Sequence, residues 1–143
     1  MLQSRRPSAP GIGYFRSAGI LRYSNGGHVD PLLLQVKQGK TSELKDTGSA
    51  LGVKENSEYR DAALPFEEGD LLLCCSDGLV ETENAEGWPM RADVVTSLAR
   101  ADRKKSSDQI ARGILNVLEK HAGGKLTEDV TLIVMKNQVY SSF

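Results

Sequence analysis

The stretch Leu71-Leu72-Leu73-Cys74-Cys75-Ser76-Asp77-Gly78 decides how the rest of the sequence is interpreted. Residues 71–75 are apolar at every position, whereas a half-buried strand would alternate apolar and polar residues. This pattern indicates a strand that is buried on both faces. The Ser-Asp-Gly that follows is typical of a turn. The sequence therefore predicts a central strand with a carboxylate, Asp77, just beyond its end.

A second apolar run, Val130–Met135, is interrupted only by Thr131 and is predicted to be another central strand. Asp129 stands immediately before it. If the two strands are antiparallel neighbours, Asp77 and Asp129 lie side by side at one edge of the sheet. Carboxylate oxygens are the ligands that Mg²⁺ and Mn²⁺ prefer, so one interpretation is a metal site. The alternative is that Asp77 belongs to a turn and Asp129 caps a loop.

Two amphipathic helices are predicted between these strands. The first spans Arg91–Ala101 and carries its apolar residues on one stripe. The second starts after Ser106, which forms a capping box with Gln109, and stops near Gly123.

The part of the chain before residue 65 has the short apolar segments and glycine-rich turns of antiparallel β structure. Asn25-Gly26-Gly27 is predicted to be a turn with left-handed backbone. We expect one domain over residues 14–137, a flexible arm over 1–13 and a flexible tail over 138–143. The expected strands are Tyr14–Arg16, Ile20–Ser24, Leu32–Lys37, Leu51–Val53 and Tyr59–Leu64.

Composition narrows the function classes. The chain has 143 residues, of which 39% are hydrophobic and 26% charged, as in an ordinary globular domain. The formal net charge of −1 hides an acidic centre, because residues 43–93 hold four bases against thirteen acids, a net −9. Such a block disfavours nucleic-acid binding and suits divalent cations, although a solvated acidic face explains it equally well.

Several single residues receive structural interpretations. Cys74 and Cys75 are adjacent, cannot bridge in ordinary disulfide geometry, and are expected to be buried thiols in a reducing compartment. With two cysteines and two histidines in the whole chain and no C-x-x-C, the sequence argues against a structural zinc site. Trp88 is expected to pack beneath a loop, and His28 to bond to nearby backbone, with a phosphate or water as its alternative partner.

Four segments resemble one family in order and spacing. The run Gly69–Glu81 (GDLLLCCSDGLVE) resembles the signature G-D-x-L-L-L-Y-T-D-G-L-T-E of the SpoIIE-like bacterial branch of metal-dependent (PPM, type 2C-like) protein serine/threonine phosphatases. Leu21–His28 (LRYSNGGH) is similar to L-x-Y-x-N-A-G-H, and Leu51–Val53 matches L-G-V. Glu128–Leu132 (EDVTL) is similar to D-D-x-T-L. The resemblance covers about residues 14–136.

The resemblance implies an α/β (α+β layered) fold, a two-sheet β-sandwich with flanking helices, of which this chain is the C-terminal portion. It implies phosphoprotein hydrolysis by a water activated by two Mn²⁺ or Mg²⁺ ions, with no catalytic residues beyond the metal ligands. Asp77 and Asp129 would be metal ligands, and Gly78, Glu81, Glu128 and His28 would support them.

The chain lacks the earlier aspartates of that family's metal centre, because no acid precedes Asp30. We therefore expect it to hold at most one ion, weakly, and to be inactive alone. The implied partner is a phosphoprotein of the anti-anti-sigma type in the bacterial cytoplasm, with no nucleic acid and no membrane. Uncovered sheet edges would also allow a homodimer. The alternative function is a degenerate, non-catalytic module that binds a regulatory protein.

Overall fold

The unbroken apolar run forms strand β6 (Leu71–Cys75), and all five of its residues are buried. In the computed structural model, which describes residues 11–17 and 19–138, β6 lies inside a four-stranded sheet. It pairs with β3 (Leu32–Gln35) on one side and with β7 (Leu132–Lys136) on the other. Strand β4 (Lys40–Glu43) pairs with β3. Every pairing is antiparallel, and the order is β4-β3-β6-β7.

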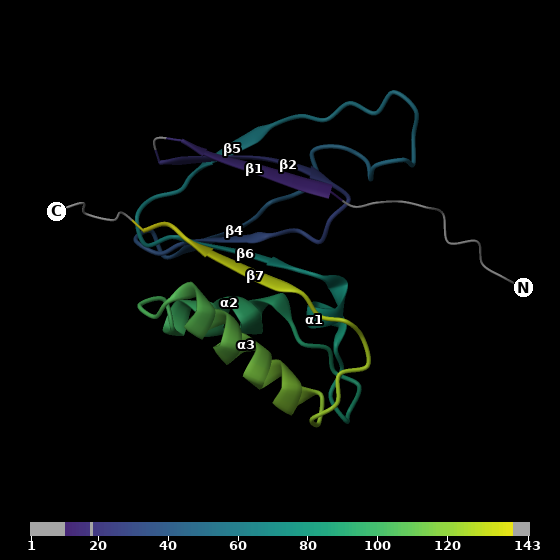
Figure 1. Cartoon of the computed structure of the whole chain (residues 1–143), viewed down its shortest axis with the longest axis vertical. Helices are drawn as coiled ribbons and strands as arrows, with labels where there is room; N and C mark the ends of the chain where they lie inside the picture. Colours follow the sequence, from purple (N-terminus) through teal and green to yellow (C-terminus); the bar gives the residue numbers. More distant parts are fainter. Residues whose placement is uncertain (1–10, 18, 139–143) are drawn as a thin grey trace, which may run out of the picture.

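A second, three-stranded sheet covers one face of the first (Figure 1). It consists of β1 (Gly11–Ser17), β2 (Ile20–Gly26) and β5 (Ala62–Pro65), with β2 in the centre. Both pairings are antiparallel. Buried side chains from the two sheets fill the space between them, as in a β-sandwich. They are Leu21, Tyr23, Leu33, Leu44, Phe66, Leu72 and Cys74.

Two helices, α2 (Ala92–Ala101) and α3 (Ser107–His121), cover the opposite face of the four-stranded sheet (Figure 1). The predicted capping box is confirmed: the Ser106 side chain accepts from the Gln109 N–H, and the Gln109 side chain accepts from the Ser106 N–H. Alternate residues of β3 and β6 pack against the helices in a second core. Its buried members are Leu32, Leu34, Leu71, Leu73, Cys75, Leu79, Met90, Val95, Ala99, Ile110, Ile114 and Leu118.

The layered sandwich is confirmed, and three elements differ from the sequence predictions. The residues of β4 are polar and give no strand pattern, yet they pair with β3 along an exposed edge. Leu51–Val53 is not a strand, because Gly52 adopts φ +79° within a turn that leaves both flanking side chains exposed. The short helix α1 (Asp77–Glu81) replaces the expected turn after β6.

Some boundaries shift. Strand β1 starts at Gly11, three residues before the expected strand, and β7 extends to Lys136. Strand β7 was expected to be buried on both faces, but it lies at the edge of the sheet, and Ile133 is 51% exposed. Most of the predicted arm and tail falls outside the described residues. Among the helices of the described ranges, none is long and apolar enough to cross a bilayer.

Candidate functional site

Two strand ends meet at one edge of the four-stranded sheet. The last residue of β6 pairs with the first residue of β7. Beyond that pair, the Ser76 N–H donates to the Thr131 carbonyl (3.0 Å), and the Thr131 N–H donates to Ser76 Oγ (2.9 Å). The condition posed from the sequence, that the two strands are antiparallel neighbours, is therefore met. They bring the segments that carry Asp77 and Asp129 to the same edge, beside α1 (Figure 1).

Gly78 sets the spacing between these two segments. It is the buried second residue of α1, and its Cα faces the backbone carbonyl of Asp129. A methyl group at this position would overlap the Asp129 carbonyl oxygen and would come within 3.5 Å of the Val130 side chain. Only a glycine allows the two backbones to come this close. Asp77 and Asp129 themselves are exposed, so their carboxylates are open to solvent.

The donor chemistry of this edge fits one hydrated hard cation. Two carboxylates completed by water can hold Mg²⁺ or Mn²⁺. Within the ranges that the structure describes, no group of three or more His, Cys, Asp and Glu side chains converges on a common point. The described residues therefore do not assemble a two-ion centre.

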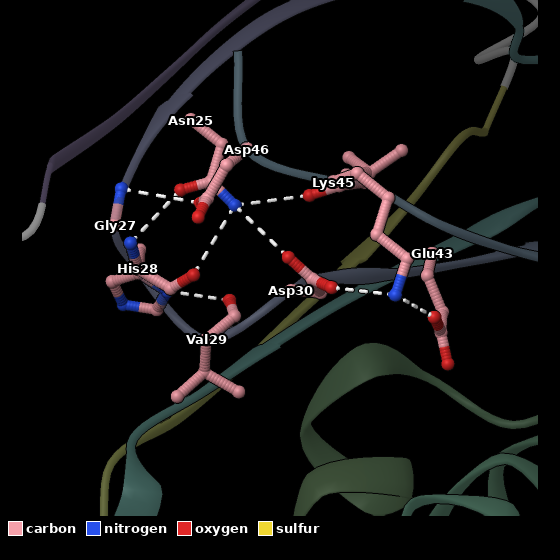
Figure 2. A network of polar contacts seen from close by, with 9 residues as sticks. Asn25, Gly27, His28, Val29, Asp30, Glu43, Lys45 and Asp46 are labelled. Atoms are coloured by element: carbon pink, nitrogen blue, oxygen red, sulfur yellow. Dashed lines mark hydrogen bonds and ion pairs between the residues drawn. The ribbon is translucent and has the colours of Figure 1, made fainter. Parts of the chain in front are cut away.

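The loop between β2 and β3 reaches the same edge, because β3 begins next to the end of β6. Asn25, near the end of β2, is fully buried, and its side chain holds this loop through hydrogen bonds (Figure 2). The amide Nδ2 donates to the carbonyls of His28 (3.2 Å) and Leu44 (2.9 Å), and the amide oxygen accepts from the His28 N–H (2.9 Å). The predicted turn over Asn25-Gly26-Gly27 is correct only at Gly27, where φ is +77°, because Asn25 and Gly26 still belong to strand β2.

His28 keeps its predicted structural role. Its Nδ1 lies 2.8 Å from the Val29 carbonyl, and because a carbonyl only accepts, Nδ1 carries the proton. Figure 2 shows the ring held against its own loop. The other ring nitrogen, Nε2, is left as an acceptor on a half-buried side chain. The fold therefore brings His28 to the edge of Asp77 without making it part of a three-residue cluster.

A charged cluster continues this loop toward β4. Lys45 forms ion pairs with Asp30 (2.9 Å) and with Glu43 (Figure 2). The hydrogen bond to Glu43 and then the one to Asp30 raise the pKa of the Lys45 ammonium. Burial, followed by the charge of Asp30, raises the pKa of Tyr23. Asp30 and Glu43 already share the ammonium of Lys45, so they are poorer candidates for metal binding than the unpaired carboxylates among the described residues.

The two predicted supporting glutamates, Glu81 and Glu128, line one cavity next to α1. The cavity has a volume of about 760 Å³ and is also lined by Glu83, Asn84 and Pro89. Its carboxylates are exposed and face open space. Glu81 lies four residues after Asp77, and Glu128 precedes Asp129, so the acidic cavity adjoins the two aspartates.

The Cys75 thiol, two residues before Asp77, is a poor nucleophile. Cys74 and Cys75 are both buried, as expected. Burial raises the pKa of Cys75 to about 11, and the charges of Cys74 and Asp77 act in the same direction. A thiol with such a pKa stays protonated near neutrality and attacks poorly.

Two residues were misjudged or overlooked in the sequence. Trp88, expected to pack beneath a loop, is 67% exposed. Asp70, at the start of β6, is 2% exposed and accepts hydrogen bonds from two backbone N–H groups. One signal in the sequence could have indicated this structural role. The aspartate stands between a glycine typical of a turn and the apolar run that predicts a buried strand.

A comparison with protein-family models shows which family the chain belongs to. The model described as Stage II sporulation protein E (SpoIIE) matches residues 11–138. The chain belongs to the SpoIIE family. Within the curated proteins, this SpoIIE-family chain is 26% identical over 117 residues to "Phosphoserine phosphatase RsbU" of Bacillus subtilis (strain 168). That match covers 82% of the chain and 35% of RsbU.

Solved structures place the SpoIIE-family chain in the PP2C phosphatase fold. The SiaA-PP2C domain of Pseudomonas aeruginosa matches 84% of the chain and 47% of that domain's chain, with a TM-score of 0.70 and 16% identity. The Mn-presoaked phosphatase domain of SpoIIE from Bacillus subtilis matches 94% of this chain and 59% of its own, with a TM-score of 0.64 and 12% identity. The chain thus spans about half the length of these solved chains.

Proposed function

We propose that the chain forms part of a metal-dependent protein serine/threonine phosphatase domain and contributes two metal-binding carboxylates to it. The observation that carries the proposal is the contact of Gly78 with the Asp129 backbone, which places Asp77 and Asp129 at one edge. Membership of the SpoIIE family and the likeness to a phosphoserine phosphatase support the same reaction class.

In this proposal, the residues of the chain itself bind the metal ion and set the spacing of its ligands. Asp77 and Asp129 would hold Mn²⁺ or Mg²⁺ through oxygen atoms, and Gly78 fixes the spacing between their backbones. When bound, such an ion lowers the pKa of a coordinated water and neutralises phosphate oxygens. Glu81 and Glu128 add negative charge beside the aspartates, which favours a cation at this edge and disfavours an unaccompanied phosphate.

For the substrate we propose a phosphoprotein of the anti-anti-sigma type. The support is the chain's place in the SpoIIE family and its similarity to RsbU. We further propose a cytoplasmic location, because both thiols are buried and reduced. The exposed Ile133 on the edge strand β7 supports the proposal that this edge pairs with a further strand or a second copy.

A second candidate function is a non-catalytic module that binds a regulatory protein. The observation that favours it is that no three metal-binding side chains converge within the described residues. The two candidates differ in activity, so hydrolysis separates them.

The metal site is tested by titrating the chain with Mn²⁺ in a calorimeter. We expect weak binding to one site, and a loss of affinity of about tenfold or more in the Asp77→Asn/Asp129→Asn double variant. Glu68→Gln, an exposed glutamate near the opposite end of β6, is the matched control and should bind like the wild type. Equal affinity in wild type and double variant would refute the site.

Activity is tested on the protein expressed within its complete natural reading frame. We expect Mn²⁺-dependent release of phosphate from a phosphoserine protein, and a decrease in kcat of about a hundredfold or more with Asp77→Asn. The 143-residue chain alone should hydrolyse the same substrate negligibly. No Mn²⁺-dependent hydrolysis by the complete protein would favour the non-catalytic module.

A further inference from the structure

The hairpin between α1 and α2 presents a large aromatic side chain to solvent. Trp88 is 67% exposed, more than any other large hydrophobic residue that the structure describes. Tryptophan is the residue type most enriched at the energetic centres of protein interfaces.

Hydrogen bonds hold the hairpin rigid around Trp88. The Asn84 N–H donates to the Trp88 carbonyl (3.0 Å), and the Asn84 side chain accepts from the Trp88 N–H (2.9 Å) and the Glu86 N–H (3.1 Å). His121, at the end of α3, donates from Nε2 to the Trp88 carbonyl (2.9 Å). A preordered loop loses little conformational entropy on binding.

The cavity of about 760 Å³ adjoins this hairpin. Pro89, the neighbour of Trp88, and Asn84, whose side chain holds the Trp88 N–H, both line it. Its carboxylates come from Glu81, Glu83 and Glu128. The ion pairs of the described part of the chain use other carboxylates, so these three charges are not neutralised there.

We propose that Trp88 and the adjoining acidic cavity form a docking surface for a lysine- or arginine-bearing segment of a protein partner. A cationic side chain can stack on the exposed indole, and further basic side chains can pair with the glutamates of the cavity. The inference rests on the proposed function in one respect: the partner is taken to be the phosphoprotein, with its basic segment flanking the phosphorylated residue.

Position and charge both favour this occupant. Glu128 precedes Asp129, and Glu81 ends the helix that Asp77 begins, so a peptide seated here extends toward the two aspartates. Nucleic acids and anionic lipid surfaces carry the same sign of charge as the cavity and are repelled. A metal ion alone gives no role to the indole of Trp88.

Trp88 is the only tryptophan of the chain, so its fluorescence reports binding directly. The experiment titrates the chain, in EDTA, with phosphoserine peptides of equal length that carry either lysines or glutamines beside the phosphoserine. A third, unphosphorylated lysine peptide isolates the basic segment. We expect both lysine peptides to bind about tenfold more tightly than the glutamine peptide, with added salt weakening them.

Variants assign the binding to this surface. By calorimetry, Trp88→Ser and the Glu81→Gln/Glu83→Gln/Glu128→Gln variant should each weaken the lysine peptides about tenfold, whereas Trp88→Phe retains most of the affinity. Glu68→Gln is the charge-matched control and should change nothing. Far-UV circular dichroism checks that each variant is folded.

The outcomes separate this proposal from the metal site. Equal affinity for lysine and glutamine peptides, or full affinity in a folded Trp88→Ser variant, overturns the docking surface. Because EDTA removes metal ions, the lysine peptides should still bind the Asp77→Asn/Asp129→Asn variant. If the wild-type chain binds the lysine peptides but shows no Mn²⁺ binding in the separate metal titration, the docking surface is upheld and only the metal site is refuted.

Discussion

The two ends of strand β6 each carry an aspartate, and the fold uses them in opposite ways. Asp70, just before the strand, is 2% exposed. Its two carboxylate oxygens accept from the N–H groups of Val36 and Glu67, each at 2.8 Å. Asp77, just after the strand, is exposed at the first position of a short helix.

The difference lies in what each carboxylate faces. Two backbone N–H groups donate to the carboxylate of Asp70. These hydrogen bonds join the β3–β4 turn to the β5–β6 turn, so the carboxylate serves the fold and not a ligand. At the other end, the contact of Gly78 with Asp129 brings two exposed carboxylates to one edge. One end of the strand therefore stabilises the sandwich, and the other leaves negative charge open to a ligand.

The largest expected effect tests this division directly. Asp70→Ala leaves two N–H groups without their acceptors, and we expect a loss of about 3 kcal/mol in the free energy of unfolding. Asp77→Ala should change it by about 0.5 kcal/mol or less. Urea unfolding followed by circular dichroism measures both. Similar losses in the two variants would remove the contrast between the two ends.

Gly78→Ala sharpens the comparison from the exposed end. The added methyl group overlaps the Asp129 carbonyl oxygen, so we expect a loss of about 2 kcal/mol in stability, together with weaker Mn²⁺ binding as the aspartates move apart. Gly113→Ala, within α3, is the matched control. Its methyl group meets only the flexible end of the Asp102 side chain, at 3.3 Å, and should stabilise the helix by about 0.5 kcal/mol. A Gly78→Ala protein as stable as wild type would show that backbone contact does not set the spacing.

The smallest effect concerns Asn137, which lies beside Asp70. Its side chain donates to the Phe66 carbonyl (2.8 Å), but its buried amide oxygen has no hydrogen-bond partner among the described residues. One bond is lost and one unsatisfied oxygen is removed in Asn137→Ala, so we expect a cost of about 1 kcal/mol. A loss in urea unfolding as large as that of Asp70→Ala would mean that Asn137 shares the role assigned to Asp70.

Strong local patterns made much of the fold predictable. The five apolar residues of β6 gave its bounds, and the Ser106–Gln109 pair gave the start of α3. The sequence analysis stated the juxtaposition of Asp77 and Asp129 on the condition that β6 and β7 are antiparallel neighbours, and they are. These features depend on residues close in sequence or on a pairing with few alternatives.

The rest depends on contacts that no local pattern records. Strand β4 has a polar sequence and becomes a strand because β3 offers it backbone partners. Trp88 is apolar, which suggested burial, yet a hairpin held by Asn84 turns it outward. The role of Asp70 requires the β3–β4 turn to arrive beside it from 34 residues away. The domain boundaries and the metal-binding roles of the site residues stay predictions; these residues are Asp77, Asp129, Gly78, Glu81, Glu128 and His28.

The two edges of the four-stranded sheet differ in how readily they could pair with a further strand. Strand β4 borders solvent with the exposed Lys40 and Glu43, which disfavour the approach of another strand. At the opposite edge, β7 offers unpaired backbone groups next to Ile133, which is half exposed. If a further strand were to pair with this sheet, β7 would be the more favourable edge and β4 the less favourable one. Ile133→Lys would place a charge on the edge strand β7 and should therefore disfavour its pairing with a further strand, even at high protein concentration.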